Sequence, residues 1–119
     1  MYSYQCIYII KSKVDENLKV YIGSTNKFNQ RKNTHKYYCE NKKDKSPYNY
    51  INENGSWENW EMTILEKTSF LENKDLRRRE ADYIEKFKKE NCLNINKPIM
   101  SKIQEEKIKK KNLIKSLRN

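Results

Sequence analysis

The stretch VYIGSTNKFNQRKNTHKYY, residues 20–38, changes from one secondary-structure pattern to another within a few residues. Its first part belongs to LKVYIG, residues 18–23, which is rich in β-forming residues. An earlier segment of the same kind, YQCIYII, occupies residues 4–10, and a polar loop separates the two. We therefore expect an antiparallel hairpin, followed by a helix over residues 28–40.

The expected helix carries two polar side chains on the face where a core would form. Phe28 and Cys39 are eleven residues apart and therefore share one face. Between them on that face lie Arg31 and His35, the only histidine of the chain. A guanidinium and an imidazole at i,i+4 seldom share a dry core, but they suit a phosphate-binding cleft, where arginine holds oxygens bidentately. A structural role for the histidine remains an open alternative.

Two tyrosines of the hairpin are candidates for chemistry. Side chains alternate along each strand, so pairing of the strands could bring the phenols of Tyr8 and Tyr21 to one surface. Each alone would be an ordinary strand tyrosine. A nearby positive charge, from Arg31 or a metal ion, would favour the phenolate, so that a tyrosine could act as a base or position the nucleophile.

Three further elements complete the predicted body. They are a helix that begins at Ser46–Pro47 and ends at Gly55, a strand over about residues 60–67, and a helix capped by Asn73 or Asp75 that runs to about Glu90. The loop LNINKP follows, and its Pro98 closes the body.

The last of these helices has a carboxylate on its apolar side. The buried stripe is predicted to consist of Leu76, Tyr83, Ile84 and Phe87. Glu80 lies four residues after the first of these and four before Ile84, hence on the same stripe. An unpaired, ionised carboxylate there would cost several kcal/mol. Two interpretations remain open: a salt bridge to a buried arginine, or a ligand of a divalent metal ion.

The composition favours a polyanionic partner. The 119 residues include 26 Lys and Arg against 16 Asp and Glu, a formal net charge of +10, and such basic domains usually bind nucleic acid. A lysine-rich composition that reflects an AT-rich genome is the alternative. We expect no membrane span or secretory signal, because the apolar runs are short. The three widely spaced cysteines suggest free thiols of an intracellular protein, in cytoplasm or nucleus, which could belong to a virus-infected host.

Half of the formal charge lies in residues 101–119, SKIQEEKIKKKNLIKSLRN, which carry a net charge of +5. Four apolar residues of this tail fall within about 100° on a helical wheel, which predicts a basic amphipathic helix that could clamp DNA, pack on the body or pair with a partner. A solvated run of charge is the alternative. The lysines expected to contact DNA are Lys107, Lys109, Lys110 and Lys111 in the tail, and Lys32 and Lys36 in the body.

Taken together, the blocks CIYIIKS, VYIGSTNKFNQRKNTHK, LRRREADYIEKF and LNINKP resemble the motifs of the GIY-YIG endonuclease superfamily in order and spacing. The resemblance covers about residues 4–98. It implies an α/β (α+β) fold in which a small three-stranded antiparallel sheet is flanked by helices. We therefore expect a nuclease-like domain over residues 1–98 and a basic C-terminal helical tail over residues 99–119.

The resemblance also implies which side chains act together. The motif residues fall on Tyr8, Tyr21, Arg31, His35, Glu80 and Asn94, with Asn96 close enough to be confused with the last of these. The pattern departs from the family at Cys6, where the first motif begins with glycine. A small cysteine fits a strand, so the departure affects only the local approach of the backbone.

The activity implied by the resemblance is hydrolysis of DNA phosphodiester bonds with a single Mg²⁺ or Mn²⁺ ion held by Glu80. Arg31 would neutralise charge on the phosphate, Tyr8 would act as the base with His35 as its partner or proton relay, and Tyr21 would position phosphate or water. The roles of the two tyrosines and the histidine are interchangeable on the sequence alone.

Biological context is less constrained than chemistry. The absence of an added recognition domain in this sequence suggests a nuclease of low sequence specificity, or a structure-specific one, from a phage, virus or mobile element. Its substrate would be duplex or branched DNA, bound by a monomer or by a dimer that forms on DNA. The alternatives are a non-catalytic DNA-binding module on the same fold, a nuclease directed at RNA, and a basic interaction protein.

Overall fold

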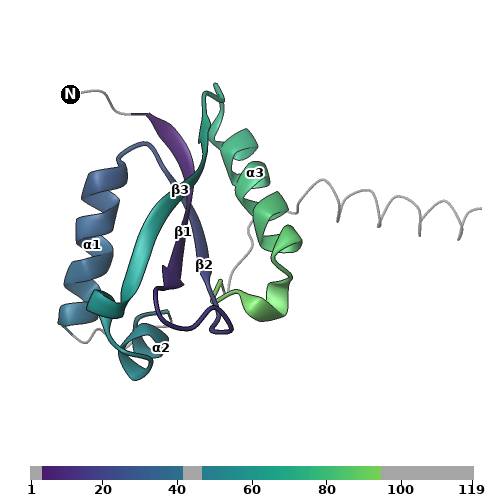
Figure 1. The fold of residues 1–119 in the computed structure, drawn as a ribbon. Helices are drawn as coiled ribbons and strands as arrows, with labels where there is room; N and C mark the ends of the chain where they lie inside the picture. The colour runs from purple at the N-terminus through teal and green to yellow at the C-terminus, as the bar shows by residue number, and fades with distance from the viewer. Residues whose placement is uncertain (1–3, 42–46, 95–119) are drawn as a thin grey trace, which may run out of the picture.

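The computed structural model describes residues 4–41 and 47–94. Its strands are β1 (Gln5–Ser12), β2 (Tyr21–Thr25) and β3 (Trp60–Thr68), and its helices are α1 (Phe28–Glu40), α2 (Tyr48–Glu53) and α3 (Asn73–Lys86), with short 3-10 turns at Trp57–Asn59 and Lys89–Asn91. The strands form one antiparallel sheet in the order β2-β1-β3. Helix α1 lies on one side of the sheet and α3 on the other (Figure 1). The predicted three-stranded antiparallel sheet flanked by helices is therefore confirmed.

The central strand β1 supports a core on each face of the sheet. Its run CIYII, residues 6–10, is buried throughout, because both faces are covered. The core beside α1 and α2 consists of Tyr8, Ile10, Cys39, Tyr48, Ile51, Trp60 and Met62. The core beside α3 consists of Ile7, Ile9, Ile22, Leu76, Ile84 and Cys92. A chain with only 35% hydrophobic residues thus places many of them in two small cores, one on each face of the sheet.

A β-bulge interrupts the pairing of β1 with β3 beside Tyr8. Ile7 pairs with Glu66 and Tyr8 pairs with Ile64, so that Leu65 is the extra residue on β3. Such bulges bend a strand and change the direction of nearby side chains, and they are common next to active sites.

The outer edge of β2 is covered by the segment that follows α3. The amide of Val20 donates to the carbonyl of Asn91 at 3.0 Å, and the amide of Leu93 donates to the carbonyl of Val20 at 2.7 Å. These bonds form a parallel bridge between Val20 and Cys92. The edge strand is therefore partly protected from pairing with another chain.

The end of α3 differs from the prediction. The helix ends at Lys86 instead of Glu90, because Lys88 adopts a left-handed conformation with a φ of 68° and a 3-10 turn follows. Phe87 consequently leaves the buried stripe and is 37% exposed. Ala81 is buried on the helix instead.

The predicted cap of α3 is also wrong. Glu72 precedes the helix without a side-chain cap, and Asn73 and Asp75 lie inside the first turn. Gly55, in contrast, follows the end of α2 with a φ of 108°, as expected for a glycine that ends a helix. Ser46, the expected cap of α2, lies outside the described residues.

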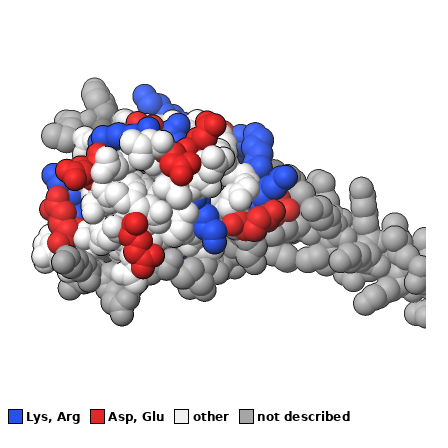
Figure 2. Space-filling view, turned by 60° about the horizontal axis from the view of Figure 1, so that its bottom comes forward, with Lys and Arg blue, Asp and Glu red and all other residues white. Residues whose placement is uncertain are grey.

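Most of the net charge also lies outside the described residues. Residues 4–41 and 47–94 contain 15 Lys and Arg and 13 Asp and Glu, a net charge of +2. Figure 2 shows both signs of charge interspersed around a broad uncharged area on one face of the molecule. Pro98, the predicted tail helix and the predicted domain boundary fall in residues 95–119 and stay predictions.

Among the described helices, none has the length and apolar character that crossing a membrane requires.

Candidate active site

Three hydrogen-bonded rings lie between the sheet and α1. His35 is 4% exposed, and its Nε2 lies 2.9 Å from the hydroxyl of Tyr8, while its Nδ1 lies 3.0 Å from the hydroxyl of Tyr48. Burial, helped by the charge of Arg31, lowers the pKa of His35 to about 4. The imidazole is therefore neutral at neutral pH, so it donates from one nitrogen and accepts at the other. The three rings come from β1, α1 and α2 and form one continuous path for a proton.

Gly23 provides the space that Tyr8 occupies. The two residues pair across β1 and β2. A Cβ atom at position 23 would overlap the Cζ and the hydroxyl oxygen of Tyr8. The glycine of YIG on one strand is therefore required by the tyrosine of the neighbouring strand.

Tyr21 lies against the same rings. Its ring centroid is 5.6 Å from that of His35 and 6.4 Å from that of Tyr8, so both tyrosines face the α1 side of the sheet, as their alternation predicted. Burial raises the pKa of both phenols above its ordinary value and outweighs Arg31, which acts to lower it. Arg31 thus favours the phenolate, as expected, but burial keeps both phenols protonated in the free protein.

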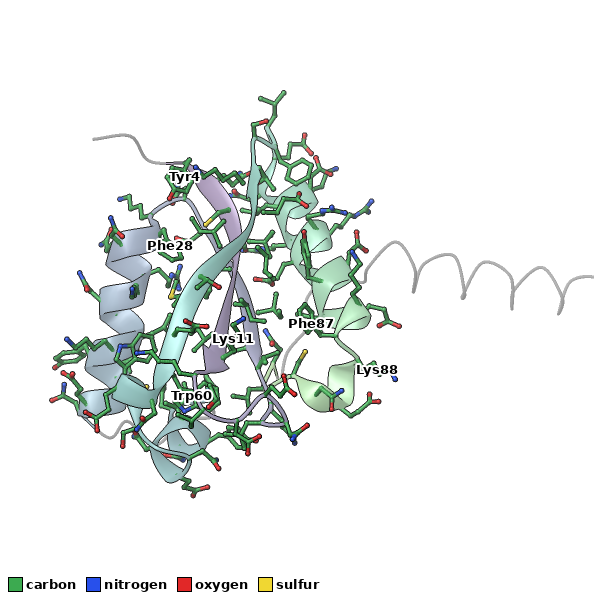
Figure 3. The ribbon with its side chains drawn as sticks, in the orientation of Figure 1. Tyr4, Lys11, Phe28, Trp60, Phe87 and Lys88 are labelled. Atoms are coloured by element: carbon green, nitrogen blue, oxygen red, sulfur yellow. The ribbon has the colours of Figure 1, made fainter. Side chains whose placement is uncertain are left out.

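Arg31 lies on the open side of this cluster. Its side chain is exposed, and together with Thr25, Lys27 and Gln30 it lines a hollow of about 420 Å³. Phe28 of α1 marks this end of the helix in Figure 3. Larger hollows of about 510 and 600 Å³ are lined by other residues. An exposed guanidinium next to buried polar rings is available to a phosphate.

Glu80 approaches the cluster from α3. Its carboxylate is partly buried and accepts a hydrogen bond from Ser24 of β2. Burial raises the pKa of Glu80, and the hydrogen bond from Ser24 and the charges of Arg77 and Arg31 oppose this shift. No salt bridge to Glu80 occurs among the residues that the structure describes, so the interpretation as a structural ion pair is not supported. The charges of Glu80 and Arg31 thus act on each other from opposite faces of the edge strand β2.

The chemistry of these donors fits one divalent cation that keeps most of its water. Glu80 retains free lone pairs beside the bond from Ser24. Both nitrogens of His35 are engaged with tyrosine hydroxyls, which leaves it unsuited as a ligand. Within residues 4–41 and 47–94, no three His, Cys, Asp or Glu side chains gather into a metal cage. Mg²⁺ is commonly held by one or two carboxylates together with water and phosphate oxygens.

Asn94 contacts the backbone of β2. Its Oδ1 accepts from the amide of Ile22 at 3.1 Å, and its Nδ2 donates to the carbonyl of Ile22 at 2.6 Å. The side-chain amide therefore behaves like one more sheet residue and positions β2, which carries Tyr21.

Of the lysines that are predicted to contact DNA, the structure describes two, Lys32 and Lys36. Lys32 and Lys36 are exposed on α1, and Lys36 lies 3.9 Å from the carboxylate of Glu40, a surface pair of little energetic weight. The tail lysines over residues 107–111 and Asn96 lie outside the described residues.

Tyr48 is the member of the cluster that the sequence motifs did not indicate. It lies thirteen residues after His35 and in a different helix, so no helical or strand period connects the two. In the sequence Tyr48 is a tyrosine at the start of a short predicted helix. Nothing in that position distinguishes a functional tyrosine from an ordinary core residue.

A small antiparallel sheet between helices, with two tyrosines, an arginine, a histidine and a glutamate at its edge strand, defines a nuclease domain. The family model described as the GIY-YIG catalytic domain matches residues 4–94, and the chain belongs to this family. Among solved structures, it is similar to the catalytic domain of the intron endonuclease I-TevI, determined as a mutant, with a TM-score of 0.67 and 27% sequence identity. That match covers 82% of this chain and 99% of the I-TevI domain. A comparison with curated protein sequences gave no match.

Proposed function

We propose that this chain is a divalent-metal-dependent DNA endonuclease that hydrolyses phosphodiester bonds. The observation that carries the proposal is the meeting of Arg31, Glu80 and the Tyr8–His35 pair around the edge strand β2. Its substrate would be duplex or branched DNA, cut with low sequence specificity or by recognition of structure. The small body fits a nuclease of a phage, virus or mobile element that acts inside the infected cell, as a monomer or as a dimer on DNA.

Tyr8 and His35 would handle the proton of the attacking water. The Tyr8 hydroxyl is protonated in the free protein, because burial raises its pKa. It becomes a base only if it passes its proton to Nε2 of His35 as it accepts one from water. The low pKa of His35 keeps its ring neutral at neutral pH, and Nε2 can take the proton in the tautomer whose Nδ1–H is donated to the hydroxyl of Tyr48.

Arg31 and Glu80 would handle the charge of the phosphate. The exposed guanidinium of Arg31 can hold a non-bridging oxygen through two N–H groups and balance the charge that develops on phosphorus. A divalent cation held by Glu80 would supply further positive charge at the phosphate and the leaving 3′ oxygen. Tyr21, whose ring lies 6.4 Å from that of Tyr8, would orient the phosphate or the water.

Plasmid cleavage tests the proposal directly. Supercoiled DNA should be converted to open and linear forms in the presence of Mg²⁺ or Mn²⁺, and EDTA should stop the reaction. A protein that binds the plasmid but leaves it intact with either metal would instead be a binding module on a nuclease fold. Matched RNA and DNA duplexes, compared in the same assay, separate a DNA nuclease from an RNA-directed one.

Removal of residues 101–119 should weaken DNA binding and reduce its dependence on salt. The tail carries a net charge of +5, whereas the described residues carry +2, so most phosphate neutralisation would be lost. The slope of log K against log salt should become shallower by roughly 0.9 for each phosphate contact removed. Fluorescence anisotropy over a salt series measures both effects. Unchanged affinity and slope would assign the tail another task.

Tyr48→Phe should slow cleavage about fivefold, because one hydrogen bond of about 1 kcal/mol to Nδ1 of His35 is lost and the tautomer of the imidazole is no longer selected. Single-turnover cleavage and the ¹⁵N chemical shifts of the imidazole measure the two effects. Tyr38→Phe is the control, since its ring lies 5.4 Å from that of Tyr48 and is partly exposed. If rate and tautomer stay the same in Tyr48→Phe, the third ring has only a packing role.

A further inference from the structure

The turn between β3 and α3 exposes two consecutive apolar side chains. Phe70 is 38% exposed and Leu71 is 101% exposed. The turn forms the end of the molecule above α3 in Figure 1. A single exposed apolar residue is normal in a folded protein. Here two are adjacent, and Tyr4, which is 39% exposed, lies at the same end of the sheet (Figure 3).

The side chain of Gln5 holds this turn in place. Its Oε1 accepts from the amide of Phe70 at 2.8 Å and from the hydroxyl of Thr68 at 2.7 Å, and its Nε2 donates to the carbonyl of Phe70 at 3.3 Å. Gln5 itself lies on β1, the central strand. The apolar residues are therefore presented from an ordered turn, so little conformational entropy is lost when they bind.

The turn stands at the same end of the sheet as the hollow at Arg31. Cys6 pairs with Thr25 on one side and with Lys67 on the other, so one rung of the sheet joins the hollow at Arg31 to the last residues before the turn. Two strand spacings amount to about 10 Å. Glu80 lies seven residues along α3 from its first residue, about 10 Å along the helix axis. These distances correspond to a few base-pair steps of about 3.4 Å.

We propose that Phe70 and Leu71 form an apolar wedge that enters between base pairs of DNA close to the scissile phosphate and bends the duplex. This inference rests on the proposed DNA endonuclease function. Apolar side chains such as phenylalanine and leucine are the ones that proteins insert between base steps, where they unstack the bases and kink the helix.

Charged side chains of both signs lie beside the turn. The described residues carry a net charge of only +2, so a contact that does not depend on charge would add to the DNA affinity of the body. Lys67 lies beside the turn, its ammonium 4.7 Å from the centre of the Tyr4 ring, and Lys74 lies 3.2 Å from the carboxylate of Glu72. Cations at this end could hold the phosphates on either side of a wedge, and the wedge would supply contact that is independent of salt.

The wedge is tested with the Glu80→Ala protein, which is expected to bind substrate without cutting it. The probe is a short duplex that contains one mapped cleavage position, with 2-aminopurine beside that position and a pair of fluorophores at its ends. Binding should raise the 2-aminopurine fluorescence several-fold, through unstacking, and shorten the end-to-end distance. Adding Leu71→Ala should abolish the fluorescence rise, relax the bend and weaken binding about tenfold, as expected for a lost buried leucine.

Val14→Ala in the same background is the matched control. Val14 is 73% exposed and lies in the loop between β1 and β2, at the opposite end of the sheet. Both residues are exposed, so neither change should alter thermal stability. The wedge is supported if Leu71→Ala, and not Val14→Ala, removes unstacking and bending.

Two results would overturn the wedge. One is an unchanged 2-aminopurine signal and bend in Leu71→Ala. The other is normal DNA behaviour together with loss of self-association in sedimentation, which would make the turn a contact between two copies of the chain. Either result leaves the nuclease proposal intact, because that proposal fails only if the wild-type chain does not cut DNA in the presence of metal.

Discussion

Glu80→Ala is expected to abolish DNA cleavage while leaving DNA binding nearly unchanged. Glu80 is the carboxylate that the structure brings to the cluster, so its loss would remove the protein ligand of the proposed cation. Charge stabilisation by such a cation is worth several kcal/mol, and about 4 kcal/mol corresponds to a roughly 10³-fold lower rate. Single-turnover cleavage and anisotropy measure the two quantities separately.

The same variant should fold as well as the wild-type chain. Burial raises the pKa of Glu80, so the unfolded state releases this proton at lower pH than the folded state does. The ionised carboxylate therefore lowers stability as the pH rises through this window, and at neutral pH its removal should leave the Tm equal or higher. A large fall in Tm would show that Glu80 is structural.

Glu61→Ala is the matched control for this change. Glu61 is a carboxylate on β3, and its surface contact with Lys11 is 3.7 Å long. Cleavage by this variant should equal that of the wild-type chain. Retained cleavage by Glu80→Ala would remove the metal role from the mechanism, whereas equal loss in both variants would point to the assay and not to the site.

Arg31→Ala should lower the cleavage rate by roughly 10²–10³, the loss typical of a group that stabilises charge in the transition state. Its guanidinium is exposed next to buried rings, so the substitution leaves no cavity in the core. The rate constant at saturating DNA should fall more than the affinity, because the charge that it balances is larger in the transition state.

Two further variants separate charge from geometry at this position. Arg31→Lys keeps the positive charge but loses the bidentate hydrogen bonds, so we expect only a small part of the activity to return. Lys19→Ala removes an exposed cation near the opposite end of the sheet and should have little effect on the rate. A loss below tenfold in Arg31→Ala would show that Arg31 only helps to position DNA.

Side chains related by a local period were the ones that the sequence could predict. The i,i+4 spacing of Arg31 and His35 and the alternation at Tyr8 and Tyr21 place these residues correctly, because one helix or one strand pair sets their directions. Tyr48 could not be found in this way, since a different helix brings it to His35. Contacts between two elements depend on how those elements pack, and the helical or strand period of one element does not predict that packing.

The errors in the sequence-based fold have the same origin. The apolar period of α3 continues through Phe87 and therefore predicts that this residue is buried. The chain leaves the helix at Lys88 instead, and residues 91–94 then bond to Val20 and Ile22 of the hairpin. The apolar pattern of α3 would allow the helix to continue. The chain instead leaves the helix and pairs with the hairpin, in a contact that joins residues more than seventy positions apart.

The amino-acid sequence by itself determined the strands, the main helices and the family motifs, because the alternation or helical period of apolar residues is a local property of the sequence. Only the tertiary structure decided the protonation states and the partners of the polar groups. It buries His35 and Tyr8 so that both are neutral, leaves Arg31 open, and brings Glu80 to Ser24. A pKa depends on the water and charge around a group, and those surroundings exist only once distant segments have packed together.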